Sequence, residues 1–320
     1  MKIRLKITWE IILLLLISLV FLASSFLSPY FLDIINLLDN TTNFMEKGLI
    51  SLAMTYIIIS GNIDISVASN MGMTSAFMGV LHRMGINIWI CALIGIIIAT
   101  IGGFLNGYLI VRFNLLAIAV TLGTYALYRG IAYMLLQDTV VGIESESFMY
   151  LGQGYIPGTP IPFSLVLYAI FAIIFGFVLH KTTFGRYVYS IGNNEQACKF
   201  SGIPVERIKI ILFTITGFMS GLGAILLTSR LSSIRPDIGI GLELETIAIV
   251  VLGGVSILGG SGNMIGVVLS LFLIGFLTYS LNLLNIPSQV ITIIMGLLLV
   301  GTVLISNLLE QRRIRTIKHK

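Results

Sequence analysis

The chain has 320 residues, of which 57% are hydrophobic and only 10% are charged, and its formal net charge is +5. Soluble domains carry about 25% charged residues, so this composition excludes an ordinary soluble protein and indicates one that crosses a membrane several times. The positive charge does not indicate nucleic-acid binding, because most lysines and arginines stand beside apolar runs, where membrane topology explains them.

Apolar runs long enough to span a bilayer follow one another along the chain, since a transmembrane helix needs about 20 such residues. We expect ten spans, at residues 8–27, 44–60, 66–82, 87–111, 114–135, 162–180, 208–229, 243–258, 262–283 and 287–307. The third and the eighth are short and flanked by glycine-rich turns, so we expect them to be broken or re-entrant. The prediction is an all-α, polytopic membrane protein of about ten transmembrane helices, with residues 1–320 in one domain.

The basic residues orient these spans. With a cytoplasmic N-terminus, the cytoplasmic segments hold Lys2, Arg4, Lys6, Arg112, Lys181, Arg186, Lys199, Arg207, Lys209, Arg312, Arg313, Arg315, Lys318 and Lys320. The outer segments and outer helix ends hold Lys47, Arg83, Arg129, Arg230 and Arg235. This asymmetry follows the positive-inside rule. It predicts a protein of the cytoplasmic membrane whose two termini both lie in the cytoplasm.

Asp64, in `SGNIDISVASNMG`, is the most informative polar residue within a predicted span. A carboxylate at membrane depth costs about 2.5–3.5 kcal/mol, so it needs a structural or functional reason. Either Asp64 caps the next helix and shares hydrogen bonds with Asn62 and Ser66, or it orders a broken helix that lines a translocation pathway. A second stretch, 252–256, resembles 60–64, and matching glycine-interrupted segments indicate a central pathway or simply close helix packing.

Further polar side chains lie on the expected fourth, fifth and eighth spans. Thr121, Thr124 and Tyr125 share one helix face, where they either present hydroxyls to a passing polyol or bond to neighbouring backbones. Arg129 is expected to extend to the membrane interface. Glu243 and Glu245 suit a helix N-terminus. The candidate pathway residues are Asn62, Asp64, Ser66, Asn70, Asn106, Thr121, Thr124, Tyr125, Glu243 and Glu245.

The longest outer segment, 137–162, contains the proline-rich stretch `GQGYIPGTPIP`. Proline stiffens a loop because it fixes φ. The segment is either an irregular surface loop or a docking site for an extracellular partner.

The polar segment 181–209 is the largest cytoplasmic one. Its basic residues are explained by topology alone, but its internal pattern also predicts a short helix. Asn193 or Asn194 can cap the N-terminus, and Ser201-Gly202 followed by Pro204 is a stop signal. The apolar face expected for this helix consists of Ala197, Phe200 and Ile203. A capped helix outside the bilayer suits a groove on a partner protein.

The stretch `GRYVYSIGNNEQACKFSGI` resembles the cytoplasmic coupling segment of sugar-type ABC importer permeases, the membrane subunits of ribose, rhamnose and autoinducer-2 uptake systems. The motifs `SGNIDISVASNMG`, `GGFLNG`, `VTLGTYALYRG` and `ELETIAIVVLGGVSILGGSGNMIG` also match this family, in the expected order. The resemblance covers residues 45–305. It implies that segment 181–209 docks on cytoplasmic ABC ATPase subunits, through Gly185, Arg186, Asn193, Asn194, Glu195, Ala197, Ser201 and Gly202.

The same resemblance implies the other partners. These are an extracytoplasmic solute-binding protein and a second permease subunit, identical or a sister chain. The solute would be a small sugar or sugar-like molecule of the rhamnose, autoinducer-2 or ribose class. ATP hydrolysis would take place on the partner ATPase.

Enzyme activity is not expected of this chain. It contains no Gly-x-x-x-x-Gly-Lys-Ser/Thr motif for ATP,. Its histidines, His82, His180 and His319, form no catalytic or metal-binding constellation with other residues, and Cys91 and Cys198 lack metal-ligand spacing. We therefore expect no metal or other cofactor. The alternative is an ion-coupled secondary transporter of a small polar solute, which would need paired ionisable residues near the midplane.

Overall fold

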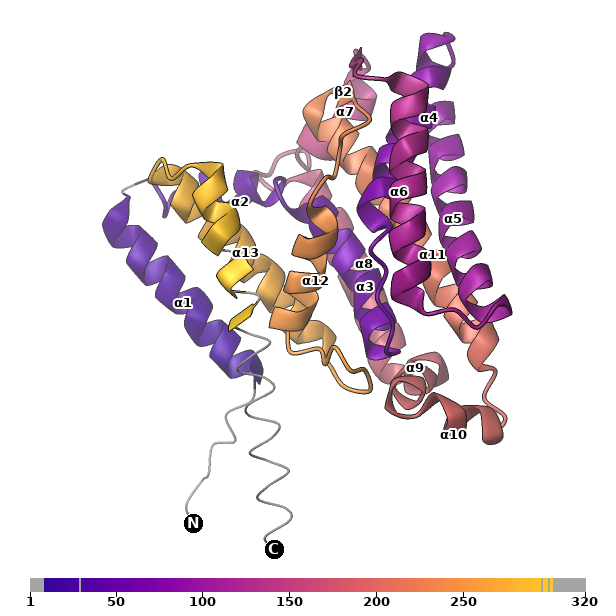
Figure 1. Ribbon diagram of the computed structural model, residues 1–320. Coiled ribbons are helices and arrows are strands. Elements are labelled where there is room, and N and C mark those ends of the chain that lie inside the picture. Colours follow the sequence, from indigo (N-terminus) through magenta and orange to yellow (C-terminus); the bar gives the residue numbers. More distant parts are fainter. Residues whose placement is uncertain (1–8, 29, 295, 299, 302–320) are drawn as a thin grey trace, which may run out of the picture.

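The computed structural model describes residues 9–28, 30–294, 296–298 and 300–301 (Figure 1). Its helices are α1 (Trp9–Leu27), α2 (Ile34–Thr41), α3 (Met45–Ile59), α4 (Val67–Arg83), α5 (Ile88–Arg112), α6 (Ala117–Leu136), α7 (Glu146–Gln153), α8 (Phe163–Lys181), α9 (Thr183–Asn193), α10 (Glu195–Phe200), α11 (Val205–Leu231), α12 (Leu242–Leu252) and α13 (Met264–Leu283). Two short strands, β1 (Val141–Gly142) and β2 (Ser233–Ile234), pair antiparallel. The predicted all-α membrane architecture is confirmed.

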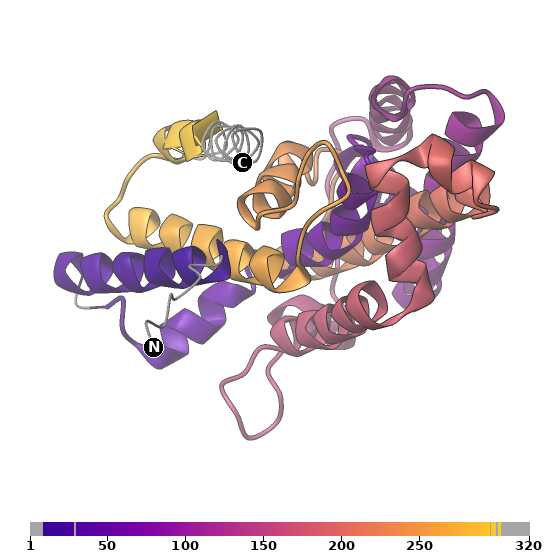
Figure 2. The same ribbon diagram turned by 90° about the horizontal axis from the view of Figure 1, so that it is seen from below.

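The long helices run back and forth between two ends of a bundle (Figure 1). We call the end that carries α9 and α10 the α10 end, and the opposite one the α7 end. Helices α1, α4, α6, α11 and α13 run toward the α7 end, and α3, α5, α8 and α12 run toward the α10 end. Seen from the α10 end, α9 and α10 lie across the ends of the membrane helices, while α1 and α13 form a side layer (Figure 2).

Two helices are broken, as their glycine-rich flanks indicated. Segment 60–66 extends inward from the α10 end before α4 begins, and segment 235–241 extends inward from the α7 end before α12 begins. The two segments come from opposite ends, and segment 235–241 meets the first turn of α4 inside the bundle, where a Cβ on Gly239 would lie 3.3 Å from the carbonyl oxygen of Ala68. Irregular backbone at membrane depth is tolerated only when protein surrounds it, and here α3, α5 and α6 do so.

Helices α3 and α11 form the centre of the bundle. Every residue of α3 except Lys47 is buried, so this helix contacts protein on all sides. Helix α11 packs along α5, and the two backbones touch at glycines: a Cβ on Gly103 would lie 2.8 Å from Gly217 Cα, and one on Gly107 would lie 2.9 Å from Ile210 Cα. Small residues allow such close approach in membranes, which is the structural role of Gly103 and Gly107 in `GGFLNG`.

Within the described residues, five helices are long and apolar enough to cross a membrane: α1, α5, α8, α11 and α13. Helices α1 and α8 bury little of their surface in the protein, and their exposed side chains include Leu15, Leu19, Ile173 and Phe177. An apolar surface of this kind belongs in lipid. The chain is therefore an integral membrane protein.

The expected spans differ from the observed helices in a few places. The eighth span ends at Leu252 instead of residue 258, because Gly253 and Gly254 stop α12. Helices α2, α7 and α9 were not expected; they are short and amphipathic, so they lack the long apolar run that marks a span. The tenth span, 287–307, lies partly outside the described residues, and a helical stretch at Ser288–Leu298 begins it.

We predict that Gly103→Ala destabilises the protein by about 1–3 kcal/mol, the usual cost of overpacking, because the new methyl group would overlap the carbonyl of Phe213. The matched control is Gly123→Ala on α6, where no atom lies within 4 Å of the added Cβ. Thermal unfolding in detergent can be followed with a thiol-reactive dye, since Cys91 and Cys198 are buried and free. Equal unfolding temperatures for both variants would contradict the close packing of α5 and α11.

Candidate functional site

A buried carboxylate organises the extended segment 60–66. Asp64 is 2% exposed, and its Oδ1 accepts hydrogen bonds from the backbone N–H of Ser66 at 2.9 Å and from its hydroxyl at 2.7 Å. The side chain thus bridges from the extended segment to the residue that precedes α4. Asn62, the other expected partner of Asp64, instead donates to Ser60 in the turn after α3.

Helices α5 and α6 hold this segment from the other side. Asn106 Nδ2 donates to Ser66 Oγ at 2.8 Å, and Asn106 Oδ1 accepts from the Tyr128 hydroxyl at 3.3 Å. Thr121 Oγ1 lies 3.3 Å from the carbonyl oxygen of Ile63. Three elements therefore meet in one buried polar cluster, which brings together Asp64, Ser66, Asn106 and Thr121 of the expected pathway residues.

Arg129 of α6 joins segment 235–241 to the first turn of α4. Its Nη1 donates to the carbonyl oxygens of Pro236 at 2.7 Å and Ile238 at 3.1 Å, and its Nη2 donates to that of Ala68 at 3.0 Å. The side chain thus turns into the bundle, and the expectation that it extends to the membrane interface is wrong. A Cβ on Gly72 would lie 2.5 Å from Arg129 Nη1, so a glycine at this position of α4 leaves room for the guanidinium.

The two carboxylates at the start of α12 have different surroundings. Glu243 is 7% exposed, and no hydrogen-bond partner is present for its Oε2 among the described residues. Glu245 pairs with Lys47 of α3 at 2.5 Å. The preceding residue of α3, Glu46, is buried and pairs with Arg230 of α11 at 2.9 Å. These ion pairs fix the α7 ends of α3, α11 and α12 relative to one another.

The remaining pathway candidates lie outside the Asp64 cluster. Asn70 ties α4 to α5 through its bond to the carbonyl oxygen of Ala99 at 3.0 Å. Thr124 donates to Val120 within its own helix at 3.1 Å. Tyr125 is partly exposed and precedes Arg129 by one turn of α6,.

The polar segment 181–209 contains two short helices instead of one. Helix α9 buries Gly185, Val188 and Ile191 against the bundle. Asn194 then caps α10, with its Oδ1 accepting from Ala197 N–H at 3.0 Å. At the other end, Gly202 adopts φ +79°, and the hydrogen bonds from Gly202 and Ile203 back to Lys199 and Cys198 form a Schellman motif,. The predicted N-cap, Asn194, and the predicted stop signal at Ser201-Gly202 therefore begin and end α10 in the structure.

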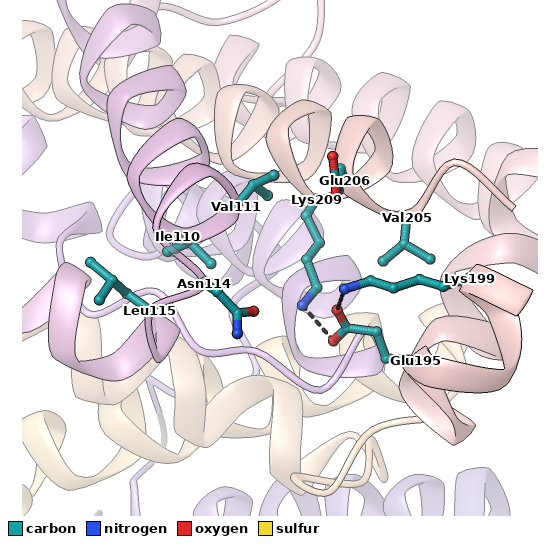
Figure 3. Close-up of a pocket in the computed structure, with 9 residues that line it drawn as sticks. All are labelled: Ile110, Val111, Asn114, Leu115, Glu195, Lys199, Val205, Glu206 and Lys209. Atoms are coloured by element: carbon teal, nitrogen blue, oxygen red, sulfur yellow. Dashed lines mark hydrogen bonds and ion pairs between the residues drawn. The ribbon is translucent and has the colours of Figure 1, made fainter.

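Charged contacts fasten α10 to α11. Glu195 pairs with Lys209 at 2.6 Å and with Lys199 at 3.2 Å. Figure 3 shows both lysines extending toward this carboxylate across a cavity of about 290 Å³, which Asn114 and Leu115 of the α5–α6 turn also line. The expected apolar face of α10 is divided: Ile203 packs on the core, while Phe200 is 92% exposed.

Partial burial opposes the ionisation of Glu195, but the hydrogen bonds and charges of Lys209 and Lys199 outweigh it and hold the pKa of this carboxyl below its ordinary value. Because the folded-state pKa is lowered, the ion pairs contribute stability above the pKa of unfolded glutamate, about 4.3. That contribution is lost as the pH falls through the folded-state pKa. At neutral pH the α10 anchor is therefore fully ionised.

The other residues expected to act in coupling lie on the same two helices. Arg186 and Asn193 are exposed on α9, Ala197 is exposed on α10, and Ser201 follows its last turn. Gly185 is buried against the backbone of Leu179, where no side chain would fit. The expected coupling residues thus belong to one compact α9–α10 unit at one end of the bundle.

Comparison with known proteins identifies the family. Residues 36–303 match the family described as "Branched-chain amino acid transport system / permease component". The chain belongs to this permease family. The permease is 35% identical over 305 residues to the L-arabinose transport system permease protein AraH of Escherichia coli (strain K12), covering 95% of this chain and 92% of the relative.

Two further relatives are similar over nearly their whole length. The permease is 33% identical over 294 residues to the ribose import permease protein RbsC of Haemophilus influenzae, covering 91% and 90% of the two chains. It is 34% identical over 307 residues to the autoinducer 2 import system permease protein LsrD of Klebsiella pneumoniae, covering 94% and 92%. No solved structure gives a significant match.

Sequence analysis of the permease missed Arg129 as a site residue. Its partners are backbone carbonyls more than 60 and more than 100 positions away along the chain, and backbone groups leave no mark on the side-chain pattern. The available signal was the arginine itself within an apolar run, together with Gly72, a small residue on the facing helix.

We predict that Arg129→Met destabilises the permease by at least about 2 kcal/mol, because the buried carbonyls of Pro236 and Ile238 lose a charged donor and each costs about 1–3 kcal/mol,. Arg129→Lys should retain part of this stability, since it keeps the charge but cannot reach both segments with a planar fork. The control is Arg235→Met, which removes only an exposed ion pair with Asp237, worth about 0–1 kcal/mol. The measurement is thermal unfolding in detergent. Equal unfolding temperatures for Arg129→Met and Arg235→Met would contradict this prediction.

Proposed function

We propose that this permease is the membrane subunit of an ATP-driven ABC importer that moves a small sugar or sugar-like solute into the cytoplasm. The observation that carries the proposal is the α9–α10 unit, a capped and anchored structure at one end of a membrane bundle with an aromatic side chain exposed on it. Such a unit suits docking by a separate protein, and membership of the permease family makes a partner ATPase the best candidate.

The α10 end faces the cytoplasm in this proposal. The basic residues of the chain support it, because Arg112, Lys181, Arg186, Lys199 and Lys209 all lie at the α10 end, and basic residues concentrate on the cytoplasmic side of membrane proteins. Trp9, the first described residue of α1, also lies at this end, where its Nε1 donates to Leu252. We therefore place the N-terminus in the cytoplasm. The C-terminus is placed there by the predicted tenth span.

Phe200 is the proposed contact with the ATPase. Large aromatic side chains that fill a pocket of the partner dominate many protein interfaces. In a groove that accepts a short helix, Phe200 and Ala197 would be the apolar anchors. Glu195 would hold α10 against the bundle through its ion pair with Lys209 of α11. The expected coupling residues Asn194, Ser201 and Gly202 would act indirectly, by setting where this helix begins and ends.

The solute class is inferred from the relatives. Their names specify L-arabinose, ribose and autoinducer 2, which are small and rich in hydroxyl groups; the sequence motifs had suggested ribose, rhamnose or autoinducer 2. A cavity of about 400 Å³ at the α7 end supports this class, since it is lined by Glu46, Lys47, Arg230 and Glu245 among others. Charged side chains of both signs bind hydroxyl groups well, because hydroxyls both donate and accept.

The pathway would continue past the two broken helices, where the Asp64 cluster and Arg129 hold segments 60–66 and 235–241. A solute-binding protein would deliver the sugar at the α7 end, where α7 and the hairpin at 155–162 project. A second permease subunit, identical or a sister chain, would complete the channel. Leu122 and Leu127 on the exposed face of α6 suit a contact with such a subunit as well as with lipid.

Reconstitution in proteoliposomes tests the proposed function. The permease is combined with an ATPase and a solute-binding protein from the same organism, and uptake of radiolabelled ribose, L-arabinose and autoinducer 2 is measured. We expect accumulation of at least one of them only when ATP and the ATPase are both present. Accumulation driven by a proton or sodium gradient without the ATPase would instead establish an ion-coupled transporter.

We predict that Phe200→Ala weakens binding of the ATPase by about 2 kcal/mol, or roughly 30-fold in dissociation constant, as expected for a buried aromatic anchor. Binding is measured with the permease in nanodiscs. Gln196→Ala, on an exposed position of the same helix, is the control and should leave the affinity within about threefold, because peripheral interface residues contribute little. An unchanged affinity for Phe200→Ala would remove Phe200 from the interface.

A further inference from the structure

The loop that follows α12 touches both the α9–α10 unit and the extended segment 60–66. We call residues 256–262 the glycine loop, because Gly259, Gly260 and Gly262 all adopt positive φ angles there. In Figure 1 this loop extends from α12 to the α10 end of α3, and in Figure 2 it lies near α9. It directly follows stretch 252–256, whose sequence resembles 60–64.

Helix α9 holds the glycine loop through two side chains. The Tyr189 hydroxyl donates to the carbonyl oxygen of Gly262 at 2.8 Å. Asn193 Nδ2 donates to the carbonyl oxygen of Gly260 at 3.2 Å. A Cβ on Gly260 would lie 2.5 Å from Asn193 Oδ1, so the loop backbone is in direct contact with the last turn of α9.

The other side of the glycine loop contacts the beginning of segment 60–66. Gly260 N–H donates to the carbonyl oxygen of Ile59, the last residue of α3, at 2.8 Å. A Cβ on Gly259 would lie 2.9 Å from Gly61 Cα and 3.1 Å from the carbonyl oxygen of Gly192. A side chain on Gly192 would overlap the carbonyl of Ile59. Four glycines therefore bring three backbones together without an intervening side chain.

The parts joined at this point are stiff. The glycine loop is closed on itself by hydrogen bonds from Ser256 N–H to Ser261 at 3.1 Å and from Gly259 N–H to Ser256 at 2.9 Å. Helix α9 is locked by Val188 and Ile191, which are buried in the main core. Close-packed groups shift together instead of absorbing a displacement, so a movement of α9 shifts the glycine loop and Gly61 with it.

Both broken helices are attached to this junction. Segment 60–66, with Asp64, begins at Gly61, and α12 runs directly into the glycine loop. At their other ends, Arg129 joins segment 235–241, which precedes α12, to the first turn of α4, which follows segment 60–66. A displacement of α10 is passed to α9, because Asn194 directly follows α9 and caps α10, and it then reaches both broken helices through one point.

We propose that Tyr189, Gly192 and Asn193 are positioning residues for energy coupling: they clamp the glycine loop and carry the movement of the ATPase from α10 to the two broken helices. This proposal rests on the proposed function and adds the route by which ATP hydrolysis would reach the pathway. The residues act through the glycine loop and do not touch solute or ATP.

The test uses the double variant Tyr189→Phe/Asn193→Ala, which removes both side-chain hydrogen bonds to the glycine loop without adding bulk. The full complex with ATPase and solute-binding protein is reconstituted, and uptake of radiolabelled ribose or L-arabinose is measured together with ATP hydrolysis. We expect the number of sugar molecules moved per ATP to fall at least threefold, while the ATPase rate per assembled complex stays within about 1.5-fold of wild type. The control is Tyr187→Phe, which alters an exposed tyrosine of the same helix and should leave the ratio unchanged.

Two outcomes would overturn the proposal. One is an unchanged ratio of transport to hydrolysis in the double variant. The other is a parallel loss of transport and hydrolysis, which would show a general structural role. If the double variant is less stable than wild type in detergent, Tyr189→Phe alone gives the same two readings. Failure of the wild-type complex to use ATP would count against the proposed function itself, so the two failures are distinguishable.

Discussion

The guanidinium of Arg129 and the two extended segments depend on each other. Arginine keeps its charge, and a regular helix offers it few acceptors, because the carbonyls of its interior are already bonded within the helix. The carbonyls of Pro236 and Ile238 lie in segment 235–241, outside any helix, and they accept from Arg129 together with the carbonyl of Ala68 in the first turn of α4. If Arg129 were absent, the breaks in the helices would leave backbone carbonyls without a hydrogen-bond donor. The charge and the broken helices therefore stabilise one another.

The same logic explains where the polar residues of the bundle lie. Asp64, Asn106 and Thr121 gather around segment 60–66, since its backbone and the residue before α4 need partners that a helix would have supplied. Ion pairs at the α7 end and the α9–α10 unit at the other end then fix both ends of the bundle. Polar groups inside this membrane protein thus mark irregular backbone, and irregular backbone is the part of a packed bundle that is able to change shape between two states.

Much of this arrangement could be predicted from the sequence. Long apolar runs gave the membrane helices to within a few residues, the glycine-rich flanks of α4 and α12 predicted broken spans, and Asn194 and Gly202 marked the limits of α10. Helix α9 was not expected, because Thr183–Asn193 is polar and its apolar face appears only when Val188 and Ile191 pack on the core. The inward turn of Arg129 and the contact of Gly61 with Gly259 depend on residues distant in the sequence, and a single sequence does not show such pairings. The roles of the candidate pathway and coupling residues stay predictions.

The side layer of α1 and α13 has a consequence for biogenesis. Trp9 and Ser24 of α1 bond to α12 and α13, yet α13 leaves the ribosome about 250 residues after α1, which takes on the order of tens of seconds at the usual rates of synthesis. During that interval α1 has to persist alone in the lipid. The sequence of α1 allows it to remain in lipid during this interval, because Glu10, in its first turn, is its single charged residue. Helix α1 therefore enters the bilayer well before α13, the helix on which it finally packs.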